Sequence, residues 1–205
     1  DGARAFTVTS GKLTVKNGTV TSNGSGTNQD DAAGSYGAVR VEGGELVMYD
    51  VTLENSRPWG AAVKMVGGKA IFRNVTINSV YGGGVEVGGV DGGSAATADF
   101  YECKFTQTEE YLYCSNLISV CYGGTANIHS GTYKGVYGLY VYNSGGTINV
   151  YGGKIIGQKE SVHIDAVAGK VSSVNVESGS LTGNVTLAQP GSVSFTAKAG
   201  VVLNG

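Results

Sequence analysis

Short runs of alternating apolar and polar residues, each joined to the next by a glycine pair, recur through most of this chain. The segments VRVEGGELVM, VKMVGGKAIF and VYNSGGTINV, at 39–48, 63–72 and 141–150, are three copies of one pattern. The glycine that ends each turn recurs every 22 to 25 residues, except at two longer intervals. A repeat of this length is typical of chains that coil into stacked and nearly identical units.

Each repeat contains short segments in which apolar residues alternate with polar ones, as in half-buried strands. Between Met48 and Val51 the alternation slips by one residue, which indicates a bend with a residue in the left-handed conformation. The residues at that bend are Asp50, Asn74, Ser130 and Gly152. Hairpins would need regular two-residue turns such as Asn17-Gly18, which is the only clear case. The pattern therefore favours a parallel coil, and no stretch has the periodicity of a helix.

The runs of the form GGxφxφxxφxφ, with φ apolar or glycine, lie at 44–53, 68–77, 124–133 and 146–155. They resemble the repeats of right-handed parallel β-helix proteins, the pectate-lyase-like superfamily and related bacterial surface proteins. The resemblance covers nearly the whole chain. It implies one all-β domain over 1–205, a single-stranded right-handed parallel β-helix of about eight rungs with two insertions. An antiparallel sandwich or barrel is the competing interpretation, and the fold itself hosts too many activities to identify one.

Composition excludes several classes of protein. The 205 residues carry a net charge of −2, and the 14 Lys and Arg residues form no basic stripe, which argues against a nucleic-acid binder. No apolar run is long enough to span a membrane, and no leader segment is recognisable. The odd number of cysteines, Cys103, Cys114 and Cys121, leaves open one disulfide with one thiol or three free thiols.

The two ends of the sequence indicate what kind of protein the chain belongs to. The pattern of the repeat already begins at Ala5, and the last residues, Val201 to Leu203, include no polar cap. Because an open β-helix end invites edge pairing, we expect flanking domains or subunits to cover both ends. The sequence thus predicts a segment of a longer secreted or surface-anchored protein of bacterial origin.

Outward-facing residues of successive rungs should form vertical columns. One predicted column on the first strand of the rung contains Thr7, Arg40, Lys64, Glu86, Val120, Tyr142 and His163. A second column, on the second strand, contains Lys16, Tyr49, Arg73, Tyr101, His129, Tyr151 and Glu177. Beside it, Asn127, Asn149 and Asn175 are expected to stack as hydrogen-bonded amides that stabilise the rungs.

Tyrosine is the most informative residue for function, since nine of the 12 lie between Tyr101 and Tyr151. Tyr133 is expected in the core. Exposed aromatic side chains with few charges around them suit neutral ligands such as sugar rings. The residues predicted to bind a ligand are Trp59, Tyr101, Tyr111, Tyr113, Tyr140, Tyr142 and Tyr151. The alternative is that tyrosine occurs here because it favours strands.

Two insertions interrupt the repeat, Ser22 to Tyr36 and Thr106 to Asn116, and loops on a rigid scaffold often carry function. The first contains Asp30 and Asp31, whose carboxylates are candidate ligands for Ca²⁺. It has no EF-hand spacing, so a solvated loop is the alternative interpretation. No other cofactor is predicted.

An enzymatic interpretation would use Arg40, Lys64 and Glu86 as an acid–base cluster, with the three residues one rung apart. A surface ladder of ion pairs is the alternative. The sequence contains neither the set of motifs expected of a polygalacturonase nor the clustered aspartates of a pectate lyase. His163 and Asp165, two residues apart on one side of a strand, predict a surface hydrogen bond.

The first functional hypothesis is therefore a non-catalytic binding or adhesion module that contacts a glycan, or a host or matrix protein, through a tyrosine-rich lateral face and the two insertions. The alternatives are a carbohydrate-active enzyme, a lyase or a hydrolase that uses the charged column, and a passive structural stalk.

Overall fold

The chain forms a parallel β-solenoid in a computed structural model that describes residues 4–22, 37–56, 60–88, 94–110, 116–142, 144–188 and 192–205. All described elements are strands, and all pairings between them are parallel. The solenoid makes about six turns, slightly fewer than the eight rungs predicted from the glycine spacing. The rungs at the two ends include strands of only three residues, β1 (Phe6–Val8) and β19 (Val202–Asn204).

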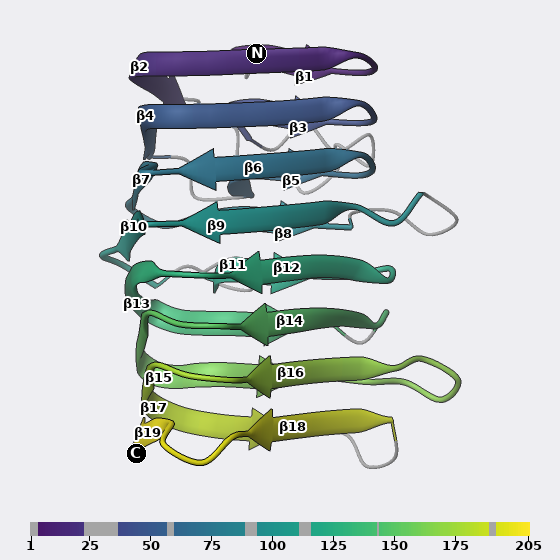
Figure 1. The fold of residues 1–205 in the computed structure, drawn as a ribbon, viewed down its shortest axis with the longest axis vertical. Helices are drawn as coiled ribbons and strands as arrows, with labels where there is room; N and C mark the ends of the chain where they lie inside the picture. Colours follow the sequence, from purple (N-terminus) through teal and green to yellow (C-terminus); the bar gives the residue numbers. More distant parts are fainter. Residues whose placement is uncertain are drawn as a thin grey trace.

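The strands build three lateral faces (Figure 1). The first face contains β1, β3 (Val39–Val41), β5 (Ala61–Met65), β8 (Gly83–Val87), β11 (Asn116–Val120) and the final parts of β13 (Gly131–Val141), β15 (Lys154–Ile164) and β17 (Ser180–Leu187). The second face contains the initial parts of β2 (Lys12–Ser22) and β4 (Glu45–Asn55), then β6 (Lys69–Arg73), β9 (Thr97–Tyr101), β12 (Gly124–Ile128), β14 (Gly146–Val150), β16 (Ser172–Val176) and β18 (Val193–Ala197). The third face contains the final parts of β2 and β4, then β7 (Thr76–Ser79), β10 (Cys103–Gln107), the initial parts of β13, β15 and β17, and β19.

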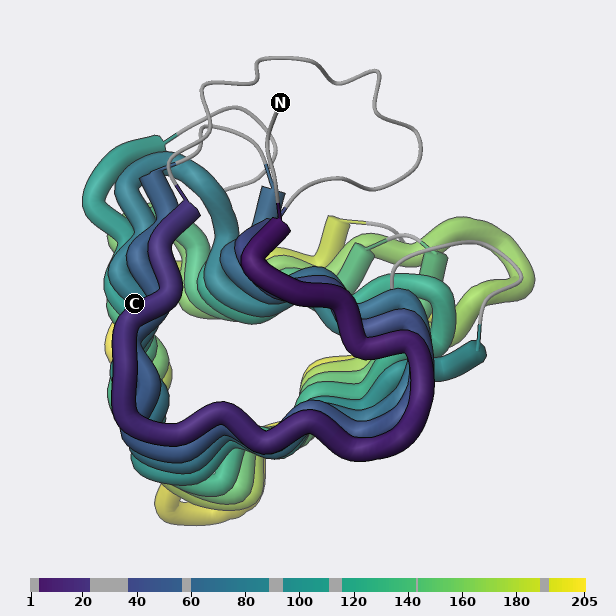
Figure 2. Tube along the Cα trace, turned by 90° about the horizontal axis from the view of Figure 1, so that it is seen from above, coloured from purple at the N-terminus to yellow at the C-terminus, as the bar shows by residue number. Residues whose placement is uncertain are grey.

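The coil is right-handed, because the chain winds clockwise as it recedes from the N-terminal end in Figure 2. Equivalent residues of successive rungs lie in register. On the second face, for example, Phe72 pairs with Met48 on one side and with Phe100 on the other. The predicted fold class is therefore confirmed, and each outward position of the repeat becomes a straight column of side chains.

Inward side chains of the three faces fill the interior with one continuous apolar core. Part of this core is aromatic: Phe72 stacks on Phe100 with ring centroids 5.1 Å apart, and Phe105 contacts both Phe100 and Tyr133 edge-on. Tyr133 is fully buried, as predicted, and its hydroxyl donates to the carbonyl oxygen of Ser130 at 3.0 Å. This core makes the solenoid a rigid support for whatever its faces carry.

The corner between the second and third faces contains the predicted left-handed residue. Asp50 and Asn74 have φ of 54° and 51°, and the Asn74 amide donates to the Asp50 carboxylate at 2.6 Å. The prediction was wrong by one residue in two later rungs, where Gly131 and Gly153 have the positive φ instead of Ser130 and Gly152. Glycine adopts this conformation at lower cost than serine, which accounts for the shift at Ser130.

Strand register also corrects the first predicted column. Glu86 pairs with Ser119, Ser119 with Tyr140, and Tyr140 with His163. Val120 points inward and is fully buried, so Ser119 and Tyr140 replace Val120 and Tyr142 in this column. The predicted alignment was therefore off by one residue at β11 and by two residues at β13. The turns around these strands differ in length, and the alternation of apolar and polar residues does not reveal that difference.

The predicted amide ladder on the second face is confirmed. The side chain of Asn175 donates to Asn149 at 3.0 Å, Asn149 donates to Asn127 at 2.9 Å, and Asn127 donates to Asp99 at 3.2 Å. Because these amides satisfy one another, they support the rungs and the neighbouring column rather than present open groups.

Candidate functional site

A ladder of stacked aromatic and cationic side chains runs along the second face at the ends of its strands. We call the column that starts at Tyr49 and continues through Arg73, Tyr101, His129 and Tyr151 the aromatic ladder. The guanidinium of Arg73 lies 4.0 Å from the ring centroid of Tyr101. The ring of Tyr101 stacks on His129 at 4.2 Å and 2°, and His129 stacks on Tyr151 at 5.0 Å and 16°. From Arg73 to Tyr151 the predicted second column is therefore confirmed as a stack of side chains.

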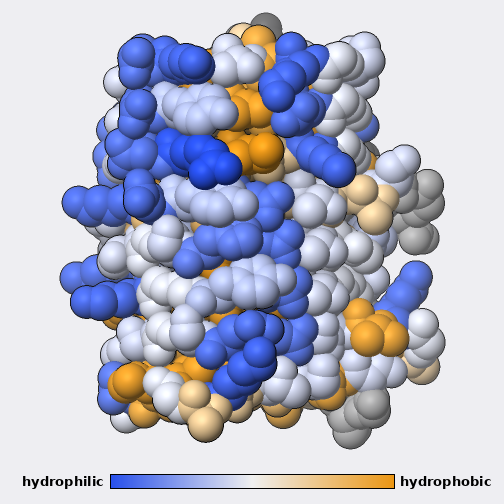
Figure 3. Space-filling view, in the orientation of Figure 1, coloured by the Kyte–Doolittle hydropathy of each residue, from blue (hydrophilic) through white to orange (hydrophobic). Residues whose placement is uncertain are grey.

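In this stack the flat faces of the rings contact neighbouring side chains of the ladder. Both faces of the Tyr101 ring are occupied, by Arg73 and His129, while Tyr151 at the end of the stack is 42% exposed. His129 also contacts Asp99 of the amide ladder, with Nε2 3.1 Å from the carboxylate. In the orientation of Figure 3 a vertical band of blue and pale side chains crosses this face, with hydrophobic (orange) atoms beside it in the upper part. The ladder thus offers hydroxyl and ring-edge contacts rather than open ring platforms.

The charged residues proposed for catalysis pair with other side chains on the first face. Nε of Arg40 lies 2.7 Å from the carboxylate of Glu42, and Nζ of Lys64 lies 3.0 Å from that of Glu86. Glu86 also accepts a weak hydrogen bond from the thiol of Cys121 at 3.7 Å. This arrangement matches the ladder of ion pairs that was the alternative interpretation of the sequence.

A small pocket lies beside Glu86. It is lined by Gly60, Ala61, Gly83, Glu86, Asn116, Ser119 and Tyr142. The amide of Asn116 donates to the hydroxyl of Tyr142 at 3.2 Å across it. The pocket has a volume of about 20 Å³, and it brings Tyr142 from the tyrosine-rich part of the chain next to the charged column.

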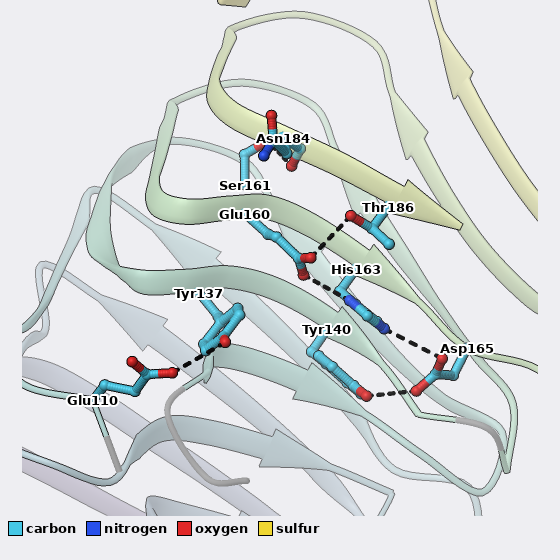
Figure 4. A network of polar contacts seen from close by, with 9 residues as sticks. All are labelled: Glu110, Tyr137, Tyr140, Glu160, Ser161, His163, Asp165, Asn184 and Thr186. Atoms are coloured by element: carbon cyan, nitrogen blue, oxygen red, sulfur yellow. Dashed lines mark hydrogen bonds and ion pairs between the residues drawn. The ribbon is translucent and has the colours of Figure 1, made fainter. Parts of the chain in front are cut away.

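Further along the first face, His163 lies between two carboxylates (Figure 4). Its Nδ1 is 2.6 Å from Glu160 and its Nε2 is 3.2 Å from Asp165, which confirms the predicted contact with Asp165. Tyr140 stacks on the imidazole at 4.6 Å, and its hydroxyl donates to Asp165 at 2.5 Å. Thr186 donates to Glu160 at 2.9 Å. We call these five residues the His163 cluster.

Burial and charge act on the hydroxyl of the tyrosines near this cluster. Burial, followed by the hydrogen bond to Asp165, raises the pKa of Tyr140 well above its ordinary value. Burial and the contact with Glu110 raise the pKa of Tyr137 as well. Tyr140 is therefore a fixed hydrogen-bond donor, and it does not supply a phenolate near neutral pH.

The geometry of the His163 cluster is closed. Both nitrogens of the imidazole face carboxylate oxygens, so neither is open to a substrate. The hydroxyl of Ser161 donates to the carbonyl oxygens of Gly183 and Asn184 rather than to His163. A glycosidase needs free space between two carboxyl groups, and here the imidazole fills that space. The cluster ties β13, β15 and β17 together and does not form a nucleophile–base pair.

Several predicted residues lie outside the part of the chain that the structure describes: Trp59, Tyr111, Tyr113, Cys114, Asp30 and Asp31. The Ca²⁺ site at Asp30 and Asp31 therefore stays a prediction. Across the described ranges no group of three or more His, Cys, Asp or Glu side chains is arranged to hold a metal ion. In the same ranges no helix has the length and hydrophobicity needed to cross a membrane.

The structure brings the described candidates to two different places. Tyr101 and Tyr151 belong to the aromatic ladder, whereas Tyr140 and Tyr142 lie on the first face, with ring centroids 4.5 Å apart. Cys103 and Cys121 are both buried, and burial raises the pKa of the Cys103 thiol to about 11. A second, open pocket formed by turns was not predicted, because it depends on the relative lengths of turns in adjacent rungs.

Comparison with known proteins gives no match to a protein-family model, to a curated protein or to a solved structure.

Proposed function

We propose that this chain is a non-catalytic binding module of a secreted or cell-surface bacterial protein, and that it holds an extended glycan along its second face. The observation that carries the proposal is the aromatic ladder. Tyr101, His129 and Tyr151 form a continuous stack on the outside of the solenoid, in which Tyr101 and His129 are half-buried and Tyr151 is exposed. Kinship with the pectate-lyase-like superfamily is part of the proposal, and the three-strand rung with its left-handed corner supports it.

The spacing of the ladder suits a polymer. Side chains of successive rungs lie roughly 4.8 Å apart, so hydroxyl and imidazole groups repeat along a line rather than converge on one point. Such an array offers one contact per rung to a chain that lies parallel to the axis of the solenoid. Stacking and the hydrogen bond from His129 to Asp99 hold the side chains before a ligand binds, which lowers the entropic cost of binding.

The test is retention of the purified chain on a panel of polysaccharides, with a double variant, Tyr101→Phe and Tyr151→Phe. The variant keeps both rings in the stack and removes only the hydroxyl groups. Because two hydrogen bonds to the ligand are lost, we expect the affinity for polysaccharide to fall by about tenfold or more. The thermal stability of the variant should not change. Tyr137→Phe is the matched control, since Tyr137 is a partly exposed tyrosine that contacts Glu110 away from the ladder. Equal retention of the double variant and the control would contradict the proposal.

A carbohydrate-active enzyme is the second candidate, and the observation that favours it is the carboxylate of Glu86 at the edge of a pocket of about 20 Å³, which is room for a water molecule rather than for a sugar ring. Its lining joins a carboxylate to the hydroxyls of Ser119 and Tyr142. Assays for new reducing ends and for unsaturated products on every retained polysaccharide separate the two functions. Product release that disappears in Glu86→Gln would establish the enzyme, whereas retention without release supports the binding module. If the chain bound a matrix protein and none of the glycans, the ligand of the module would be a protein.

A further inference from the structure

An open pocket lies at the corner between the first and second faces, away from the aromatic ladder. Three successive turns form it, and its lining residues are Tyr122, Gly123, Ser144, Gly145, Gly169, Lys170 and Val171. Its volume is about 510 Å³, which is within the range of small-molecule sites. No role for this pocket follows from the ladder or from the His163 cluster.

Unequal turn lengths create the hollow. The turn between β11 and β12 has three residues and that between β13 and β14 has four, but the turn between β15 and β16 has seven. The long turn projects beyond the other two (Figures 1 and 2). It therefore walls one side of a space that the shorter turns leave open.

The hydrogen bonds of the backbone fix the shape of this corner. The amide of Tyr122 donates to Ser144 Oγ at 3.1 Å, and that of Gly123 donates to the Gly145 carbonyl at 3.0 Å. The amide of Gly146 donates to the carbonyl of Val171 at 3.0 Å. Tyr122 has φ of 48°, which is uncommon for an aromatic residue and turns its side chain out of the strand direction. The pocket is thus preformed from the three turns.

Its chemistry combines an apolar surface with one cation. Tyr122 is 36% exposed and Val171 is 72% exposed, and no stacking partner of Tyr122 is found among the described residues. The hydroxyl of Ser144 accepts from a backbone amide and keeps its own hydrogen for a ligand. Asp165, the carboxylate in the same turn as Lys170, is directed to Tyr140 and His163 instead. Across the described ranges, Lys170 is in no ion pair.

From this combination we propose that the corner pocket binds a carboxylated sugar residue at the end of a glycan chain. The apolar face of the sugar would lie against Tyr122 and Val171, its carboxylate would pair with the ammonium group of Lys170, and a hydroxyl or carboxylate oxygen would accept from Ser144. A terminal residue fits because the pocket opens at a corner and is walled by the projecting turn. This inference rests on the proposed function as a glycan-binding module, but it uses none of the residues of the ladder.

The test compares sialyllactose, a glucuronate-terminated oligosaccharide and neutral lactose by titration calorimetry on the whole chain. We expect saturable binding of at least one acidic probe and none of lactose, and the two acidic probes tell a sialic acid from a uronate. Lys170→Gln and Tyr122→Ala should each weaken that binding by about tenfold or more. Lys154→Gln, which neutralises an exposed lysine on the third face, is the matched control and should leave binding unchanged. Binding should also weaken as salt is raised, since the ion pair is open to solvent.

Equal binding of lactose and the acidic probes, no binding of any probe, or an unaffected Lys170→Gln variant would each overturn the inference. The double variant Tyr101→Phe and Tyr151→Phe separates this outcome from failure of the proposed function. If that variant loses retention on polysaccharide while the pocket variants bind as the parent does, only the pocket assignment fails. If the pocket variants lose the acidic probe while the ladder variant retains polysaccharide, only the ladder assignment fails.

Discussion

The aromatic ladder and the His163 cluster use similar side chains to opposite effect. Each contains tyrosine stacked on histidine, at 4.2 Å in the ladder and 4.6 Å in the cluster. In the cluster, the second carboxylate, Glu160, and the hydroxyl of Tyr140 complete a closed set of hydrogen bonds. In the ladder, His129 has one carboxylate contact, with Asp99, while Tyr101 is half-buried and Tyr151 is exposed. The difference shows that the same tyrosine–histidine stack occurs once with its imidazole held between two carboxylates and once with a single carboxylate contact.

The largest effect is expected from Gly157→Ala, beneath the His163 cluster. A Cβ at this position would lie 1.8 Å from the carbonyl oxygen of Glu160, which is backbone and cannot move without shifting the cluster. We expect a loss of about 3 kcal/mol in the free energy of unfolding, measured by urea denaturation. Gly18→Ala is the control, because a Cβ there meets no atom within 4 Å, and it should change stability by less than about 1 kcal/mol. Similar results for both would mean that the cluster does not depend on this close approach.

His163→Ala should cost less, about 2 kcal/mol, because it removes two contacts with carboxylates, while Glu160 keeps its hydrogen bond from Thr186 and Asp165 keeps its hydrogen bond from Tyr140. Thermal denaturation measures the loss. Retention on polysaccharide should be unaffected, since the cluster is closed. A variant of normal stability that no longer binds would reverse the comparison and make the cluster the binding surface.

His129→Ala is the matching change in the ladder. It removes two stacking contacts, with Tyr101 and Tyr151, and should cost about 1 kcal/mol of stability. We expect the affinity for polysaccharide to fall more than the stability, because Tyr101 and Tyr151 lose the imidazole ring that lies between them. The same polysaccharide retention assay gives the result, and an unchanged affinity would argue that the ladder is structural.

The smallest effect is expected at Glu110, at the exposed margin of the His163 cluster. Its hydrogen bond from Lys159 lowers the pKa of the carboxyl group, so any stabilisation is present at neutral pH and is lost as pH falls through that lowered pKa. Because both groups are open to solvent, Glu110→Gln should leave the thermal midpoint at pH 7 unchanged within error. A clear drop at pH 7 that salt does not reduce would show that the cluster extends further than its five residues.

The fold was predictable because every rung repeats the same alternation, so a slip in one rung is visible against the others. The second-face column could be aligned from sequence since its strands begin directly after the glycine turns, as at Gly44 and Gly68. The first-face column could not, because Val120 and Tyr142 stand at the start of turns of unequal length, between β11 and β12 and between β13 and β14. The same inequality hides the pocket at Tyr122 and Lys170. The sequence was enough to name candidate residues. Whether the polar groups of those residues are already hydrogen-bonded depends on contacts between rungs, which the sequence does not show.

The stacked interior has a consequence for how this chain tolerates change over evolution. Each buried side chain touches its equivalents in the rungs above and below, as Phe72 touches Phe100. A larger residue at one level is therefore best accommodated by a smaller one at the same place in the next level. In a set of homologues, correlated substitutions should concentrate at separations of one repeat rather than between neighbours in sequence. The periodicity of the fold would then reappear as a periodicity in the pattern of covariation.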